Sequence, residues 1–124
     1  MATTHQTRIF KTVWFSKSAK KAGLTDEQLC KAMKQVMEGK ADDLGAGVYK
    51  KRLNDNLHRS IIIAKSGRIW VYQYLFAKQD RANIDEGELL QFRALAKAYA
   101  TLTETQLNKL IADKEFLEIC HDKD

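Results

Sequence analysis

The middle of the chain gathers the side chains that could handle a phosphate group. Residues 48–81 contain eight Lys or Arg against two Asp or Glu, a net charge of +6, whereas residues 82–124 contain five against nine, a net charge of −4. Cationic side chains bind polyanions and stabilise negative charge that develops during a reaction. The basic centre therefore favours a nucleic-acid partner, and the competing interpretation is a solvated surface that happens to be basic.

Other kinds of reactive site have little support in the residues. His5, His58 and His121 are scattered, and the chain has neither a phosphate-binding glycine loop nor a nucleophile elbow, so no metal or cofactor is expected. Cys30 and Cys120 have neither metal-ligand spacing nor the density of a disulfide scaffold. We interpret them as small apolar side chains, one on a helix and one in a short final strand.

The length of 124 residues predicts one domain over residues 1–124. No stretch is long and apolar enough to cross a bilayer, and the polar segment Met1–Thr7 lacks the apolar centre of a signal peptide. We therefore expect a cytoplasmic protein without a membrane partner.

The hydrophobic pattern predicts an α+β fold, with a small antiparallel sheet and helices packed on one face. The segment 41–47 is expected to be a glycine-containing loop. In the last central strand, aromatic side chains recur at every second position, namely Trp70, Tyr72, Tyr74 and Phe76. The expected strands are Arg8–Phe15, a central antiparallel meander of Val48–Leu53, His58–Lys65 and Arg68–Lys78, and a short final strand Phe116–Cys120.

Three helices carry the same start signal, a capping box followed by an apolar stripe. In each, a Thr or Asp side chain precedes a Glu or Gln by three residues, and the three boxes are Thr25 with Gln28, Asp85 with Glu88, and Thr103 with Gln106. A shorter helical turn over Ser16–Ala22 is expected to end at Gly23.

The segment Phe76–Ile84, with the sequence FAKQDRANI, resembles the F-A-K-x-x-R-A-N-I signature of RelE/HigB-type toxins of bacterial type II toxin–antitoxin modules. The opening Lys11–Phe15, with the sequence KTVWF, and the order of the basic and aromatic strands match the family over nearly the whole chain. Two features depart from it. Leu75 stands where a glycine is common, and the loop Asn54–His58 lacks the usual glycines.

The resemblance implies a RelE-like fold and a toxin that cleaves mRNA on the ribosome without a metal. In such enzymes the ribose 2′-hydroxyl attacks the adjacent phosphate and the 5′-oxygen leaves. The reaction needs a proton acceptor, positive charge beside the phosphate and a proton donor. The implied partners are a cognate antitoxin, expected to be of the helix-turn-helix type, together with the ribosome and mRNA.

Within this resemblance, the basic residues receive candidate roles. Arg59 and Arg81 are candidates for stabilising the phosphate, Lys51 and Lys78 for orientation or proton transfer, and His58 for acid or base. The candidate RNA contacts are Lys50, Arg52, Lys65, Arg68 and Tyr74. Each of these residues also has an interpretation without function: a cation can simply lie on the solvated surface, and a strand tyrosine can pack in the core. Strand alternation also directs Lys50 and Arg52 to the face opposite that of Lys51.

Two other functions remain open at this point. A ParE-like toxin on the same scaffold would poison DNA gyrase without cleaving RNA, because a fold does not fix a function. A non-catalytic nucleic-acid-binding module would use the same basic surface for affinity alone.

Overall fold

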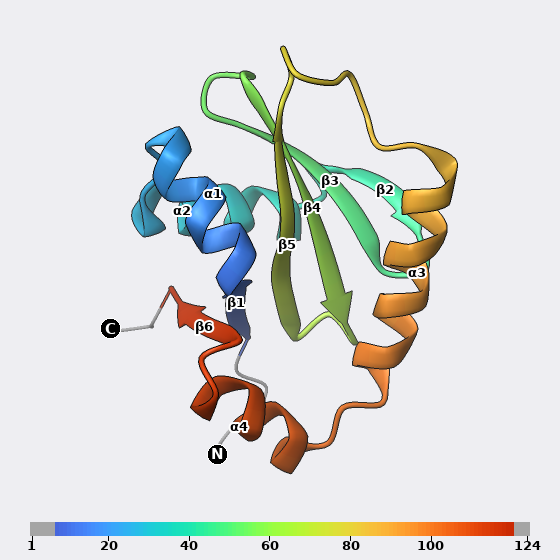
Figure 1. Ribbon diagram of the computed structural model, residues 1–124. Coiled ribbons are helices and arrows are strands. Elements are labelled where there is room, and N and C mark those ends of the chain that lie inside the picture. Colours follow the sequence, from blue (N-terminus) through green and yellow to red (C-terminus); the bar gives the residue numbers. More distant parts are fainter. Residues whose placement is uncertain (1–6, 121–124) are drawn as a thin grey trace.

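The computed structural model describes residues 7–120 as an α+β fold, which confirms the predicted class; residues 1–6 and 121–124, including His5 and His121, lie outside the described part. Six strands form one sheet in the order β2-β3-β4-β5-β1-β6 (Figure 1). The strands are β1 (Arg8–Thr12), β2 (Asp42–Gly45), β3 (Val48–Leu53), β4 (His58–Lys65), β5 (Ile69–Ala77) and β6 (Phe116–Ile119). The helices are α1 (Val13–Ala22), α2 (Asp26–Met37), α3 (Glu86–Ala100) and α4 (Glu104–Ala112).

The sheet is mixed rather than wholly antiparallel. The central meander of β3, β4 and β5 is antiparallel as predicted, but β1 pairs in parallel with β5, with Ile9 opposite Trp70 and Lys11 opposite Tyr72. A parallel neighbour requires a long crossover, and the chain from α1 to β4 supplies it. This pairing is long-range, so no local pattern in the sequence reports it.

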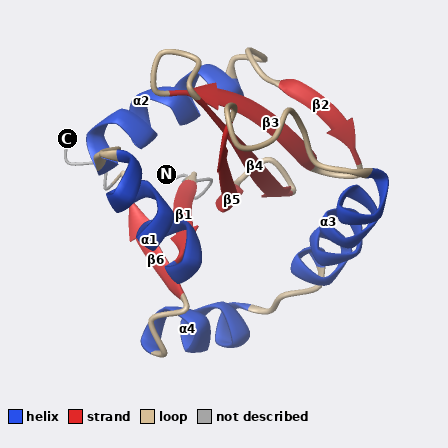
Figure 2. Cartoon of the chain, turned by 45° about the horizontal axis from the view of Figure 1, so that its top comes forward, coloured by secondary structure: helices blue, strands red, loops and turns tan. Residues whose placement is uncertain are grey.

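Helices cover both faces of the sheet, where one covered face was expected. The run Ile61, Ile62 and Ile63 in β4 is fully buried, and strand alternation sends Ile62 to one face and its neighbours to the other. Ile62 packs with residues of α1 and α2, whereas Ile61 and Ile63 pack with residues of α3. Figure 1 shows α1 and α2 on one side of the strands and α3 on the other, and Figure 2 shows the helices arranged around the twisted sheet. A continuous apolar run is the sequence sign of a strand buried on both sides.

A bulge in β5 divides its aromatic residues between the two faces. Ile61 pairs with Tyr74 and Ile62 with Tyr72, so Gln73 is the extra residue. Tyr72 therefore belongs to the core under α1 and α2, while Tyr74 packs in the core under α3. In a regular strand, aromatic residues at every second position would all lie on one face, and the bulge is the reason that these lie on two.

Side-chain caps fix where the helices begin. All three predicted capping boxes are present, at Thr25, Asp85 and Thr103. The Thr12 hydroxyl accepts a hydrogen bond from the Phe15 backbone N–H at 3.0 Å, and this cap ends β1 and starts α1 three residues before the predicted boundary. The segment predicted as a loop contributes β2, an edge strand paired with β3.

Cys30 and Cys120 form a disulfide, so their interpretation as separate apolar side chains is wrong. Their Cα atoms lie 5.4 Å apart, although 90 positions separate them in the sequence. Cys30 lies in α2, and Cys120 follows β6, which ends at Ile119. The pairing depends on β6 joining the sheet beside β1, a tertiary arrangement that cysteine spacing cannot report.

The phenol of Tyr72 links the sheet to α2. It is fully buried, stacks on Phe15 with ring centroids 4.8 Å apart, and donates to the backbone oxygen of Leu29 at 2.7 Å. Burial raises the pKa of Tyr72 well above its usual value near 10. A raised pKa means that the neutral phenol favours the fold below pH 10 and that this contribution is lost as the pH rises towards the folded-state pKa.

We expect Tyr72→Phe to lower the free energy of unfolding by about 1 kcal/mol at neutral pH, the usual net value of one hydrogen bond. The variant should also lose part of the alkaline destabilisation of the wild type, because the phenylalanine side chain has no phenol to ionise. Urea denaturation at pH 7 and at pH 10.5 measures both effects. An unchanged denaturation midpoint at pH 7 would contradict the role of the hydrogen bond.

Candidate functional site

Four cations lie on the sheet face that α3 covers, and we call Lys50, Arg52, Arg59 and Arg81 the cationic cluster. Lys50 and Arg52 alternate with buried Val48 on the same face of β3. Arg52 lies directly opposite Arg59 on β4, and Arg59 lies opposite Phe76 on β5. Like charges directly opposite each other destabilise a sheet. The cluster therefore carries an electrostatic cost that a bound anion would relieve.

Arg59 is buried at the end of the sheet, with 8% of its surface exposed. Its guanidinium donates to the backbone oxygens of Asn56 at 2.9 Å and His58 at 3.2 Å. Within residues 7–120, no carboxylate lies at ion-pair distance from it. Arg59 is thus a fixed positive charge without an opposite charge beside it.

The loop before Arg59 contains no glycine, although glycines are usual there in the toxin family that the sequence resembles, and three of its residues adopt left-handed backbone conformations. Asn54, Asp55 and Asn56 have φ values of 56°, 54° and 73°. Asn and Asp adopt this region more readily than other residues with a β-carbon. The loop therefore makes its turn without glycine and directs the Asn56 carbonyl towards Arg59.

Arg81 lies beside the cluster's other members and has four partners. Its Nε donates to the Asn83 backbone oxygen at 3.0 Å, and its Nη1 lies 3.4 Å from the Tyr74 hydroxyl. The two Nη atoms donate to the two carboxylate oxygens of Glu88, one of them at 2.9 Å. The guanidinium also lies 5.6 Å from the centroid of the Phe76 ring. These contacts fix the orientation of Arg81.

The charges of Arg81 and Glu88 stabilise each other. Hydrogen bonds from Arg81 hold the pKa of the Glu88 carboxyl below its usual value, and the same bonds raise the pKa of Arg81. Asn83 joins this pair to the cluster, because its side-chain oxygen accepts from Lys50 Nζ at 3.4 Å. The same oxygen accepts from the Ile84 backbone N–H at 2.9 Å. Asn83 thus shapes the turn into α3 while it links two cations.

A shallow cavity of about 340 Å³ lies at this end of the sheet, and Arg81, Tyr74 and His58 line it together with Lys21 of α1. Asn54 Nδ2 and His58 Nδ1 lie 3.1 Å apart, at hydrogen-bond distance, and this contact orients the imidazole ring. The Tyr74 ring packs between Phe76 and Phe92, with centroids 5.7 and 5.9 Å away. Its hydroxyl, and not its ring face, is therefore the part that can meet a ligand.

Lys78 lies at the border of the cluster, and Lys51 lies on the other face of the sheet. Lys78 is exposed just after β5, where its backbone N–H donates to the Leu57 oxygen at 2.9 Å. Lys51 points to the opposite face, as alternation predicted, and its Nζ donates to the Lys40 backbone oxygen at 3.1 Å. Burial, together with the charge of Lys40, lowers the pKa of Lys51. The amine of Lys51 is therefore directed away from the face that carries Arg59.

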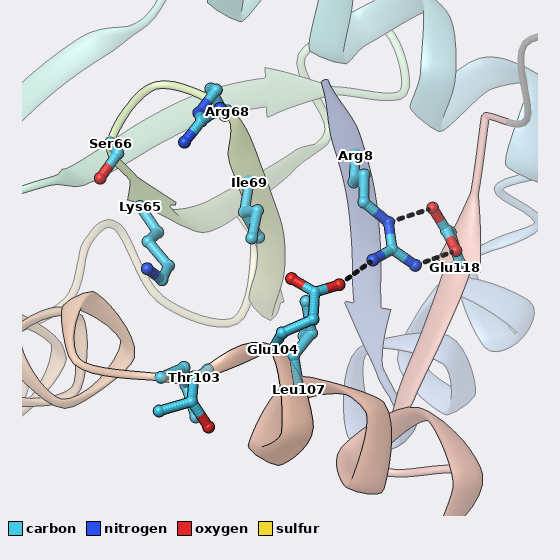
Figure 3. A pocket seen from close by; sticks show the side chains of 10 residues that line it. Arg8, Lys65, Ser66, Arg68, Ile69, Thr103, Glu104, Leu107 and Glu118 are labelled. Atoms are coloured by element: carbon cyan, nitrogen blue, oxygen red, sulfur yellow. Dashed lines mark hydrogen bonds and ion pairs between the residues drawn. The ribbon is translucent and has the colours of Figure 1, made fainter. Parts of the chain in front are cut away.

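Lys65 and Arg68 lie at the other end of β4 and β5, around a second cavity of about 580 Å³. Figure 3 shows them across the pocket from Arg8, whose guanidinium faces Glu104 and Glu118. The structure therefore separates the ten predicted site residues. Five lie on the α3 face, namely Lys50, Arg52, Arg59, Tyr74 and Arg81. His58 lies opposite Leu53 on the face that α1 and α2 cover, and it borders the cavity that Arg81 also lines. Lys78 lies at the border of this group, and Lys51, Lys65 and Arg68 lie elsewhere.

Glu88, Asn83 and Lys21 also neighbour the site, although their places in the sequence did not indicate it. Glu88 is visible in the sequence only as part of a capping box, and no local signal indicates that its carboxylate also meets Arg81. Lys21 reaches the cavity because α1 packs beside β5, a contact between distant parts of the chain.

Comparison with known proteins identifies the family. A family model described as the RelE toxin of the RelE/RelB toxin–antitoxin system matches residues 7–119. No curated protein and no solved structure gave a significant match. Among the described helices, none has the length and apolarity required to span a membrane. Since the family model covers most of the 124 residues, the chain belongs to the RelE toxin family, and its activity is that of the toxin of a toxin–antitoxin pair.

Proposed function

We propose that this toxin is a ribosome-dependent endoribonuclease that cleaves mRNA and so inhibits translation. The observation that carries the proposal is the cationic cluster, in which Arg59 has no opposing carboxylate and lies on the same face as Arg81. Such a surface attracts the RNA backbone and supplies positive charge beside a reacting phosphate. It also fits the family of toxins to which the chain belongs.

In the proposed reaction, the ribose 2′-hydroxyl oxygen bonds to phosphorus and the bond from phosphorus to the 5′-oxygen breaks. The products carry a 2′,3′-cyclic phosphate and a 5′-hydroxyl group. One proton leaves the attacking hydroxyl and another reaches the departing oxygen, so the reaction needs no external reactant. Arg59 and Arg81 stabilise the five-coordinate phosphorus, because their planar guanidinium groups match two phosphate oxygens.

His58 is our candidate for proton transfer, since it lines the same cavity as Arg81 and histidine is the side chain that most often serves as a general acid or base. Lys78, at the border of the cluster, would orient the RNA backbone together with Lys50 and Arg52. Lys51 is a weaker candidate because its amine points to the other face. The Tyr74 hydroxyl, 3.4 Å from Arg81, would contact the phosphate.

Dependence on the ribosome has a physical basis in the shape of the site. The cavity is shallow, and Arg52 and Lys78 are exposed. Few side chains would therefore enclose an RNA strand and hold its 2′-hydroxyl in line with the scissile phosphate. Alignment of the attacking oxygen supplies much of the rate of such reactions. A ribosome that holds mRNA in place would provide this alignment, and the toxin would act in the cytoplasm where ribosomes are found.

Membership of the family implies an antitoxin partner. We propose that it is a helix-turn-helix protein that presents an acidic segment to the cationic cluster, since complementary charge favours association with such a surface. Neutralising Arg59 and Arg81 would block RNA from the site.

Induction of the protein in growing cells, followed by mapping of transcript ends, tests the nuclease proposal. We expect new 5′ ends inside translated regions within minutes, and no such ends on the same transcripts when their start codons are removed. Purified protein should likewise leave naked mRNA intact and cut it in a translation mixture. Growth arrest with intact transcripts would overturn the proposal, and arrest with a DNA-damage response would instead favour gyrase as the target.

A further inference from the structure

We propose that Glu88 occupies the position of the substrate phosphate on Arg81, so that an RNA phosphodiester must displace this carboxylate in order to bind. The inference rests on the proposed function, because it assigns the anion that Arg81 receives. It makes the first turn of α3 an intramolecular competitor of the RNA.

The geometry of the pair carries the inference. Both Nη atoms of Arg81 meet both oxygens of one carboxylate, which is the same fork that arginine offers to two phosphate oxygens. The two side chains are about one-third exposed, at 32% for Arg81 and 29% for Glu88. An anion from solvent can therefore reach the guanidinium once the carboxylate moves aside.

The surroundings favour the exchange. Among the described residues, Arg81 is the one member of the cationic cluster that a carboxylate contacts at hydrogen-bond distance, while Lys50 has Asp42 at 3.8 Å. With Glu88 in place, the cluster still carries more positive than negative charge, so it attracts a phosphate before Glu88 leaves. The arriving group gains Arg59 and Arg81 together, whereas Glu88 contacts Arg81 alone.

Glu88 also caps helix α3, and this second role allows a substitution that removes only its charge. Its Oε1 accepts the Asp85 backbone N–H at 2.9 Å and so completes the capping box of α3. Glutamine performs the same task in α2 and α4 of this chain, where Gln28 and Gln106 accept the backbone N–H of the capping threonine. Glu88→Gln should therefore keep the start of α3 and remove the competing charge.

The test measures binding without cleavage, using a fluorescent single-stranded RNA oligonucleotide with 2′-O-methyl riboses that cannot react. We expect Glu88→Gln to bind this probe roughly tenfold more tightly than wild type, the difference made by one charge-assisted contact. The matched control is Glu118→Gln, which also removes a bidentate carboxylate from an arginine, here Arg8, but at the far end of the sheet. Both variants raise the net charge by the same amount, so Glu118→Gln controls for the general electrostatic effect on RNA affinity. We expect it to change affinity by less than about twofold, because a charge at the far end of the sheet is largely screened by salt.

The proposal would be overturned if Glu88→Gln bound the RNA probe no more tightly than wild type, or if Glu118→Gln showed the same gain in affinity. It would also be overturned if no variant bound the probe measurably. Adding Arg81→Ala to Glu88→Gln should cancel the gain, and its persistence would also count against the assignment. Circular dichroism and melting temperatures verify that each variant is folded. Because the probe cannot be cleaved, failure here is distinct from failure of the nuclease proposal, which transcript mapping tests.

Discussion

Replacing Arg81 by alanine is expected to lower the rate of mRNA cleavage by a factor of about 100 to 1000, the usual cost of removing one preorganised donor from a developing oxyanion. Arg81 is oriented by Tyr74, Asn83 and Glu88 before any substrate arrives. Its guanidinium therefore needs little rearrangement beyond the release of Glu88. Primer extension on a defined mRNA in a reconstituted translation system measures the rate.

Two further variants separate chemistry from folding in this experiment. Arg81→Lys keeps the charge but loses the fork, so we expect a rate between those of wild type and Arg81→Ala. Arg8→Gln removes another arginine held by a carboxylate, at the opposite end of the sheet, and should cleave within about twofold of wild type. Cleavage by Arg81→Ala within threefold of wild type would exclude Arg81 from a role at the phosphate.

Removal of the disulfide has the largest expected effect on stability. The double variant Cys30→Ser with Cys120→Ser should lose about 4 kcal/mol in the free energy of unfolding, because the bond closes a loop over a separation of 90 residues and restricts the unfolded chain. Guanidinium denaturation of the oxidised wild type and of the double variant gives this difference. Pairing with β1 and hydrophobic burial then have to hold β6 in the sheet.

The reductant dependence is the control for this prediction. Wild type with excess reductant should denature close to the double variant, and reductant should leave the double variant unchanged. A loss under about 1 kcal/mol, or two free thiols per chain in the untreated wild type, would contradict the predicted contribution of the bond. Since disulfides are rare in the reducing cytosol, the reduced protein is the form relevant to the proposed action on ribosomes.

Local signals in the sequence predicted the local parts of the fold. The capping boxes at Thr25, Asp85 and Thr103 are all present, because each depends only on residues three positions apart. The strands β3 and β4 have their predicted bounds, since alternation and the turns that flank them are also local. The family signature over Phe76–Ile84 led to the same family as the comparison with known proteins.

What the sequence did not reveal depends on contacts between distant residues. The parallel pairing of β1 with β5, the packing of α3 and α4 on the second face, and the bond between Cys30 and Cys120 all join segments far apart in the chain. The site follows the same rule. A basic stretch indicated an anion partner, but only the register of β3 and β4 places Arg52 opposite Arg59, and only the fold brings Glu88 to Arg81.

The extra residue at Gln73 has a consequence for how relatives of this toxin should be aligned and engineered. Positions before it and positions after it follow opposite parity, so a burial pattern taken from Trp70 and Tyr72 is inverted at Tyr74 and Phe76. Removing Gln73 would restore regular alternation, with Tyr72 still opposite Ile62 and Tyr74 still opposite Ile61, so Tyr74 would stay on the face that carries Arg81. A relative that lacks the bulge is therefore best aligned with a gap at Gln73, which keeps the positions on both sides of it on their observed faces.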